Sequence, residues 1–290
     1  MKNLLPLLLL PLLFSACTED EKEREPQTPQ EMYELAGRLL KPNVQGEQSD
    51  FEGALRWTRR AAEAGHLQAQ LDMGGMYLNG GRLVKPDAAA AYRWFCRAAE
   101  QGSMGAEVFV GMLLYDGKGV EQNRDEALRH WRRAADAGVA AAQFRLGRVL
   151  VQQPEGVQEG MNLLVLAARE GHAGGVPQAA TALGNLYYKG TNGAPQDMEK
   201  AAKWYALGAG AGDPMAQLVY AMMLLTGENV ARDEARGMAM LRMAAGQDYL
   251  PAMVQLIQRL QQDEGDEDKA REAAAWGRRL EELTAPKEKK

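Results

Sequence analysis

The stretch "AYRWFCRAAEQGSMGAEVFVGMLLYDGKGV", from Ala91 to Val120, places small residues at fixed offsets between two bulky, apolar runs. Its motif "AAEQG" ends at Gly102 and returns as "AAEAG", "AADAG", "AAREG", "GAGAG" and "AAGQD". These motifs end at Gly65, Gly138, Gly171, Gly212 and Asp248, and the successive spacings over the whole series are 37, 36, 33, 41 and 36 residues. A period in this range is typical of stacked helical hairpins.

Alignment on these motifs exposes two further sets of small residues and one set of bulky residues. The first small set lies four positions beyond the motif's last residue, at Ala69, Ala106, Ala142, Ala216 and Ala252. The second lies five positions later, at Gly74, Gly111, Gly147, Gly184 and Ala221. Bulky residues precede the alanine pair by four positions, at Trp57, Trp94, Leu163, Trp204 and Met240, and His130 is an exception because Trp131 is shifted by one.

Each repeat is therefore predicted to contain a helix A with the bulky residues, a turn at the motif glycine, a helix B with a small face, and a loop. Small facing residues let two helices approach closely, while the bulky residues fill the space between neighbouring hairpins. The motif glycine suits a left-handed residue just past a helix end, where a side chain would be penalised.

The combined pattern A-x-x-W/Y-x-x-x-A-A-x-x-G-x-x-x-A-x-x-x-L-G-x-x-Y-x-x-G-x-G-V resembles the Sel1-like repeat, a relative of the tetratricopeptide repeat. The resemblance covers roughly residues 31–283, about six repeats. It implies an all-α fold, a right-handed α-solenoid that binds proteins along its concave face and has no catalysis of its own.

Several segments depart from the pattern. Seven residues, "HAGGVPQ", separate Gly171 from Ala179, and "QQPEGVQEG" forms a short loop in repeat three. These either bend the array near its middle or are tolerated loop variation. Repeat six lacks the motif glycine, and residues 272–283 predict a polar-faced helix that caps the array. Residues 31–40 are predicted to form a first B helix at the other end.

The N-terminus has the features of a secretory leader. Residues 1–16 contain one basic residue, an apolar stretch too short to span a bilayer, and small residues before Cys17. "FSAC" resembles a bacterial lipobox, which implies acylation of Cys17, and the alternative is a plain signal peptide cleaved near Ala16. We expect a periplasmic protein held on a membrane through lipid, with Thr18 favouring the outer over the inner membrane.

The predicted organisation has four parts. Residues 1–16 form the lipoprotein signal peptide, and residues 17–30 form the lipidated cysteine and a charged tether with too little apolar surface to fold. The repeat solenoid covers 31–284, and 285–290 is a charged tail. If Cys17 carries lipid, Cys96 has no partner for a disulfide within the chain.

Composition and motifs exclude several function classes. The net charge of −5 and the lack of a Lys/Arg-rich run argue against nucleic-acid binding. No G-x-S-x-G, P-loop, HExxH or Rossmann motif is present, so we predict no catalytic residues and no cofactor. We also predict no metal site, since the three histidines have no metal-ligand spacing, and we expect a monomer.

The candidate binding residues form an arginine ladder in the first three repeats. Two arginines lie four residues apart on each helix A, on one face of the helix: Arg56 and Arg60, Arg93 and Arg97, Arg129 and Arg133. Such a row favours an acidic protein surface or anionic headgroups, because arginine binds carboxylates in bidentate fashion. The alternative is that Glu63, Glu100 and Asp136, three positions after the second arginine of each pair, neutralise it.

Eight methionines and one cysteine are weaker candidates. The methionines could form an adaptable recognition surface, although core filling is the more common role of this residue. They are Met198, Met215, Met222, Met223, Met238, Met240, Met243 and Met253. Cys96 is interpreted as a small helix residue rather than a redox site.

Three functions remain open from the sequence. The first is an adaptor or regulator that binds envelope proteins. The second, implied by the resemblance to lipidated Sel1-like proteins encoded beside type VI secretion effectors, is an immunity protein that neutralises a toxin in the periplasm. The third is an enzyme acting on the cell wall.

Overall fold

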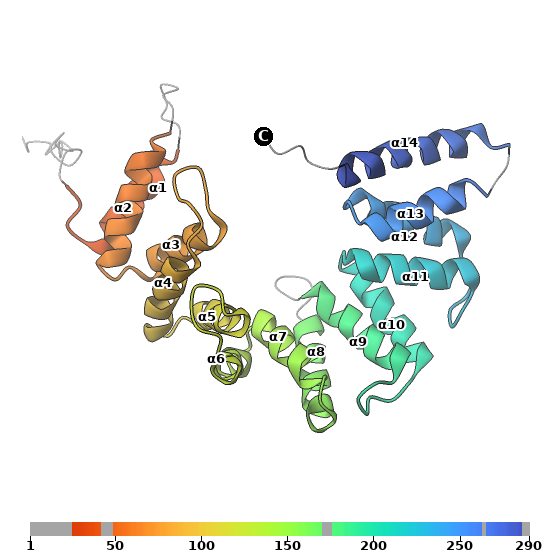
Figure 1. The fold of residues 1–290 in the computed structure, drawn as a ribbon, viewed down its shortest axis with the longest axis horizontal. Helices are drawn as coiled ribbons and strands as arrows, with labels where there is room; N and C mark the ends of the chain where they lie inside the picture. Colours follow the sequence, from red (N-terminus) through yellow and green to blue (C-terminus); the bar gives the residue numbers. More distant parts are fainter. Residues whose placement is uncertain (1–24, 42–48, 170–175, 263–264, 286–290) are drawn as a thin grey trace, which may run out of the picture. The chain divides into compact units, whose positions relative to one another are not determined.

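The computed structural model describes residues 25–41, 49–169, 176–262 and 265–285, and every regular element within these residues is helical. The chain divides into two compact units, residues 1–86 and 87–290. In the first unit lie α1 (Pro29–Leu39), α2 (Phe51–Glu63) and α3 (Leu67–Asn79) (Figure 1). The second contains α4 (Ala88–Glu100), α5 (Met104–Asp116), α6 (Arg124–Asp136), α7 (Ala140–Leu150), a short 3-10 helix η2 (Pro154–Gly156), α8 (Val157–Arg169), α9 (Pro177–Lys189), α10 (Met198–Gly210), α11 (Pro214–Thr226), α12 (Glu234–Gly246), α13 (Leu250–Leu260) and α14 (Glu267–Thr284).

The helices alternate as the repeat pattern predicts, which confirms an all-α repeat fold. The A helices are α2, α4, α6, α8, α10 and α12, and each has thirteen residues. Five of them begin at a side-chain cap that accepts a hydrogen bond from a backbone amide of the first turn: Asp50, Asp87, Asn123, Asp197 and Asp233. Such caps satisfy amides that have no partner inside the helix, so they fix where each A helix starts.

The turn from helix A to helix B has the backbone geometry predicted for the motif glycine. Gly65, Gly102, Gly138 and Gly212 have φ of 94°, 86°, 84° and 91°. Gly171 lies outside the described residues. In repeat six the motif ends in Asp248, which adopts φ of 58°, and aspartate is one of the side chains that tolerate this region.

The small B-helix residue packs against a bulky residue of the helix A that follows it. A Cβ atom at Gly111 would lie 2.5 Å from Nε1 of Trp131, and one at Gly184 would lie 2.8 Å from the ring of Tyr205. Both partners are the eighth residue of helix A, one position after the bulky set found by alignment. Trp131 therefore occupies the same packing position as Tyr205. His130 is the seventh residue of its helix, and no residue is shifted in this repeat.

Burial supports this register. The eighth residues Phe95, Trp131, Leu164, Tyr205 and Leu241 are all buried. Among the seventh residues, Trp94, Leu163, Trp204 and Met240 are only half-buried. In α4, α8, α10 and α12 the seventh residue covers the edge of the core and the eighth fills it. In α2 the seventh residue, Trp57, is itself buried, and the eighth is Thr58.

The outermost helices pack against the array as predicted caps. α1 packs on α2, and its first turn is fixed by a capping box between Thr28 and Glu31. α14 packs on α13 and begins at Glu267, five residues before the predicted start, because Asp266 caps it by accepting from two backbone amides.

The predicted loop "QQPEGVQEG" is shorter than expected: residues 152–156 form the connection and include η2, whereas residues 157–160 are the first turn of α8. The insertion "HAGGVPQ" falls mostly outside the described residues. None of the described helices is long and apolar enough to cross a bilayer.

Candidate protein-binding surface

The six ladder arginines are the sixth and tenth residues of their A helices, and all six are exposed. Arg56 and Arg60 lie on α2 in the first unit, and the other four lie on α4 and α6 in the second. Because positions six and ten are one helical turn apart and point away from the buried alanines, they mark the centre of each helix's solvent face. We call the solvent face of the A helices within each unit the helix A face of that unit.

The tenth residues are held by neighbouring side chains. The guanidinium carbon of Arg60 lies 4.8 Å from the ring centroid of Trp57, and that of Arg97 lies 4.8 Å from the ring of Trp94. Arg133 instead donates to the carboxylate of Glu107, at 2.8 Å. A cation over an aromatic face is stabilised without being neutralised.

The neighbouring acids do not neutralise the ladder. None of Glu63, Glu100 and Asp136 forms an ion pair with an arginine among the described residues. Arg56, Arg93 and Arg129 likewise have no ion pair within this part of the chain. The positive charge of the helix A face therefore remains available to a partner.

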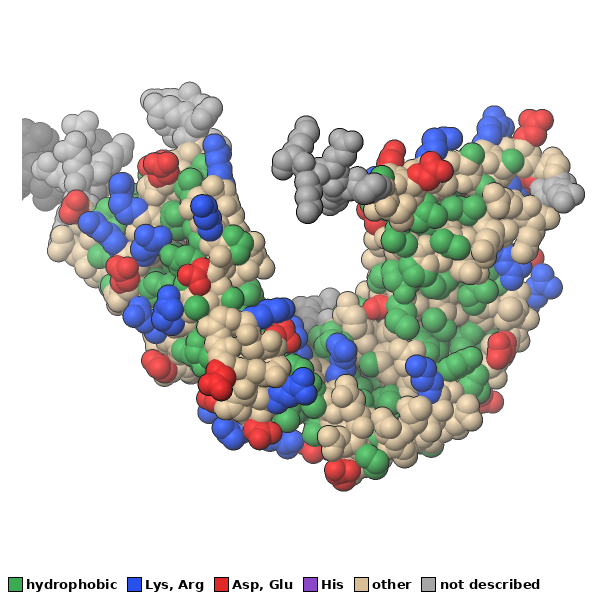
Figure 2. Space-filling view, viewed as in Figure 1, with side chains coloured by type: hydrophobic (Ala, Val, Ile, Leu, Met, Phe, Trp, Pro, Cys, Tyr) green, Lys and Arg blue, Asp and Glu red, His purple; other side chains and the backbone are tan. Residues whose placement is uncertain are grey.

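The helix A face changes character in the later repeats, which our sequence reasoning missed. The tenth residues of α8, α10 and α12 are Leu166, Leu207 and Met243, and they are 48%, 42% and 52% exposed. Comparing the tenth residue of every A helix would have identified them from the sequence. Figure 2 shows Lys and Arg side chains over α4 to α6; the hydrophobic areas that it shows over α11 to α13 lie largely on the B helices α11 and α13 and are separate from the helix A face.

A buried carboxylate lies beneath the ladder in the second repeat. Glu107 on α5 is 5% exposed and is paired with the imidazole of His130 and with Arg133, both on α6. At the equivalent place, Gln70, Gln143 and Gln217 donate from their amides to the backbone carbonyls of Ala62, Ala135 and Ala209. Glutamate cannot donate in this way when ionised, so His130 and Arg133 compensate its charge.

Cys96 and Tyr92 lie on the same side of α4. Burial raises the pKa of the Cys96 thiol, and the nearby carboxylates of Glu100, Glu107 and Glu126 raise it further against a hydrogen bond with Tyr92. Burial also raises the pKa of Tyr92 to about 12. The thiol therefore lacks the thiolate character of a reactive cysteine, which agrees with its interpretation as a helix residue.

The methionines divide between core and surface. Met223 and Met253 are buried, Met198, Met222, Met238 and Met240 are half-buried, and Met215 and Met243 are exposed. Met243 belongs to the helix A face, and Met215 lies on the B helix α11. Within the described residues, no group of three His, Cys, Asp or Glu side chains is placed to hold a metal ion.

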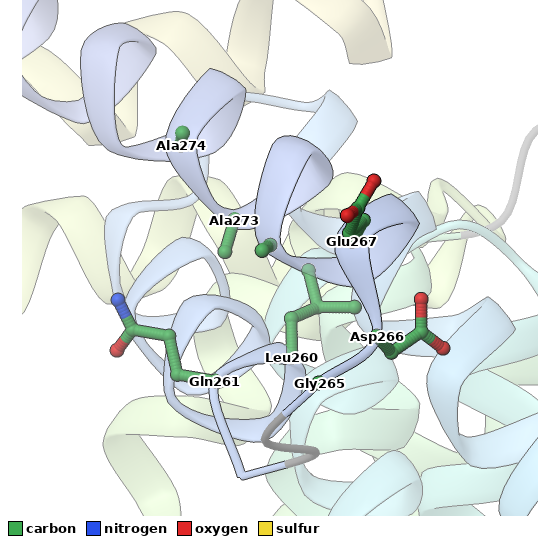
Figure 3. Close-up of a pocket in the computed structure, with 8 residues that line it drawn as sticks. Leu260, Gln261, Gly265, Asp266, Glu267, Ala273 and Ala274 are labelled. Atoms are coloured by element: carbon green, nitrogen blue, oxygen red, sulfur yellow. The ribbon is translucent and has the colours of Figure 1, made fainter.

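A hollow between α13 and α14 is a product of packing. Figure 3 shows it lined by the short side chains of Ala273 and Ala274, with Leu260 below and Asp266 and Glu267 at its rim. Ala273 is the buried residue of α14, and Ala274 is exposed, so no bulky side chain of α14 fills the space. Asp266 is occupied as the cap of α14, so the hollow offers no free polar group at its floor.

The proposed lipidation site cannot be placed on the structure. Cys17 and the leader, residues 1–16, lie outside the described residues.

Comparison with known proteins identifies the same repeat. The Sel1 repeat family model matches residues 32–66, 67–103, 105–139, 140–172, 177–213 and 214–249. Each complete match covers a B-type helix and the A helix that follows it, so the family unit is offset by one helix from the hairpin described above. No curated protein matches the chain significantly.

Solved structures share the fold. A protective antigen of uropathogenic Escherichia coli with an SLR fold is 26% identical over 91% of this chain, with a TM-score of 0.70. A Sel1 repeat protein from Oxalobacter formigenes is 28% identical over 80%, with a TM-score of 0.67. This chain spans only 55% and 66% of their lengths. An immunity protein from Pseudomonas aeruginosa is 18% identical, covers 82% of this chain and 88% of its own, and has a TM-score of 0.51.

Proposed function

Because this chain belongs to the Sel1 repeat family, we propose that it is a protein-binding adaptor without catalysis of its own, acting through its helix A face. The observation that carries this proposal is the row of exposed arginines that no acid among the described residues neutralises, except Arg133. Arginine is enriched at protein interfaces because its planar group binds carboxylates in bidentate fashion.

Crosslinking and affinity capture of the tagged, full-length protein from native membranes tests this function. The test variant is Arg93→Glu with Arg129→Glu, two exposed arginines without an ion pair. The control is Lys85→Glu with Arg278→Glu, which makes the same charge change at exposed sites away from the helix A face. We expect the test variant to lose the main captured protein and the control to keep it; equal capture by both variants would refute the assignment of the surface.

Localisation is a further part of the proposal. We propose that the chain is a monomer anchored by acylated Cys17 to the periplasmic face of the outer membrane. Intact-mass analysis of the purified protein should show a diacyl or triacyl addition at Cys17, and Cys17→Ala should release the protein from membranes. An unmodified N-terminus near Ala16 would instead establish a cleaved signal peptide.

Immunity to a toxin is the second candidate function. Immunity proteins of the same fold show that this architecture can serve such a role. A toxin gene beside the gene for this chain, with rescue from that toxin by this protein, would establish it. Capture of several envelope-assembly proteins that is lost with the lipid anchor would favour the adaptor.

A further inference from the structure

The helix A face of the second unit is divided into a basic half and an apolar half. At positions six and ten, α4 and α6 carry only arginine: Arg93, Arg97, Arg129 and Arg133. At the same positions, α8, α10 and α12 carry Asn162 and Leu166, Lys203 and Leu207, and Ala239 and Met243. The change from arginine to an apolar tenth residue occurs once, between α6 and α8.

The two halves adjoin. Arg132 on α6 donates to the carboxylate of Glu159 on α8 at 2.7 Å, which joins the A helices on either side of the change. Further along, Trp204 of α10 packs on the core cluster that contains Leu164 of α8, and Met240 of α12 packs on the cluster that contains Tyr205 of α10. Successive A helices from α6 to α12 are therefore linked by an ion pair or by a shared core cluster.

Most arginines of the basic half have no acidic partner to neutralise their charge. Arg93 and Arg129 have no ion pair among the described residues, and Arg97 is stacked on Trp94, which leaves its charge in place. Only Arg133 is paired, with Glu107. The surface of α4 and α6 is thus complementary to several carboxylates held close together.

The apolar half repeats one exposed side chain on each of three successive A helices. Isolated exposed apolar residues are normal on any protein, but the same helical position is apolar in Leu166, Leu207 and Met243. A hollow on α10, next in sequence to Leu207, is lined by apolar and charged side chains: Glu199, Ala202, Lys203, Ala206, Tyr220, Asn229 and Val230. Such a recess can accept an apolar side chain.

We infer that this face binds one protein segment with acidic residues at one end and apolar residues at the other. This inference rests on the proposed function, because it specifies the partner chemistry of the same surface. A polypeptide suits the spacing better than a membrane, since the apolar residues are single and flush with a helix face and do not form a protruding apolar edge.

Synthetic peptides test this inference on the full-length protein. The first probe carries glutamates in one half and leucines in the other, with a reversed version to cover both chain directions. The control probe has the same composition in scrambled order. We expect one of the two block peptides to bind at least about tenfold more tightly than the scrambled peptide in fluorescence anisotropy.

Variants of each half separate the two contributions. Arg93→Glu with Arg129→Glu should weaken binding of the block peptide at low salt and reduce the loss of affinity caused by added salt, because attractive charge pairs are replaced by repulsive ones. Leu207→Glu with Met243→Glu should weaken binding while the dependence on salt remains. Met215→Glu, an exposed apolar residue on the B helix α11, is the control for the second variant and should leave binding unchanged. Circular dichroism confirms that each variant is folded.

The outcomes distinguish this inference from the proposed function. One outcome refutes only the inference of a two-part partner segment. In that outcome the arginine variant loses its captured protein, Leu207→Glu with Met243→Glu retains it, and the scrambled peptide binds as well as the block peptides. The adaptor function would still stand. If neither variant affects capture, both are wrong. Binding to phosphatidylglycerol vesicles and to neither block peptide would overturn the inference in favour of a lipid surface.

Discussion

At the scale of single residues, the repeat depends on pairs in which a missing side chain makes room for a large one. Gly111 and Trp131 form such a pair, and the Trp131 indole is fixed by donating to the carbonyl of Val108 at 3.1 Å. In later repeats the bulky partner is a leucine: a Cβ atom at Gly147 would lie 3.0 Å from Cγ of Leu164, and Ala221 shares a core cluster with Leu241. The small residue is therefore retained opposite bulky residues of different size.

This pairing predicts the effect of adding one methyl group. Gly111→Ala should destabilise the protein by about 1–2 kcal/mol, because the new Cβ collides with Trp131 and overpacking outweighs the gain in helix propensity. Gly105→Ala is the matched control on the same helix, where a Cβ meets only Ser103 Oγ at 3.9 Å, and it should be neutral or slightly stabilising. Urea unfolding measures both; equal stability of the two variants would contradict the packing rule.

The turn glycine predicts a different kind of cost. Nothing lies within 4 Å of a Cβ built at Gly102, so its φ of 86° alone resists substitution. Gly102→Val should cost about 1–3 kcal/mol in the free energy of unfolding. Gly102→Asn should cost less, since Asn192 and Asn229 adopt positive φ elsewhere in this chain. Valine and asparagine variants of equal stability would show that φ does not constrain this turn.

At the scale of helices, the contact between α5 and α6 differs from the equivalent contacts in other repeats. Two changes occur together there: glutamate replaces the glutamine found at Gln70, Gln143 and Gln217, and His130 replaces an aromatic or aliphatic residue. The sequence displayed both changes, but their pairing appears only when the buried position of Glu107 is known.

A double-mutant cycle tests this pairing. His130→Ala should cost about 1–3 kcal/mol in the free energy of unfolding, because a buried carboxylate loses one of its partners. The same substitution in a Glu107→Gln background should cost much less, since the amide can donate to a backbone carbonyl as the other glutamines do. Additive costs would show that the two residues are not coupled.

The docking of α14 predicts a dependence on pH. Arg242 donates to both carboxylate oxygens of Glu272, at 2.7 and 2.9 Å, and this contact lowers the pKa of Glu272 in the folded protein. A lowered folded-state pKa stabilises the fold above the carboxylate's ordinary pKa, and this contribution is lost as pH falls through the folded-state value.

The size of the pH effect is small because the pair is partly exposed, about 0.5–1 kcal/mol. Hydrogen exchange of α14 amides, corrected for intrinsic rates, should therefore show less protection at acid pH than at neutral pH. Glu272→Gln should remove most of this difference. An unchanged pH response in that variant would assign the effect to another group, of which Asp266 is the nearest, since hydrogen bonds from the backbone amides of Lys269 and Asp268 lower its pKa.

At the scale of the whole molecule, the period and the small residues were sufficient to predict the fold. The repeat length, the helix order and the glycine turns all follow from local spacing, which is why these predictions are confirmed. The alignment identified the seventh residues as the bulky set and did not single out the eighth, because both positions are bulky in several repeats. Only burial separates the residue that fills the core from the one that covers it.

The candidate site was predictable only in part. The sequence located the arginines and offered acids three residues away as alternative partners. Two of the arginines instead contact the rings of Trp57 and Trp94, and sequence spacing cannot decide between the two kinds of contact. The apolar half of the helix A face was visible in the sequence but was not predicted, because the arginine pattern ends before the helices that carry it.

The central claim is that the helix A face contacts the partner, and site-specific photocrosslinking in living cells tests it most directly. A photoreactive residue at position 93 is compared with one at position 178, since Gln178 is equally exposed but lies on the B helix α9. We expect one dominant crosslinked protein from position 93 and none from position 178. The same crosslinked protein from both positions, or from position 178 alone, would contradict the account.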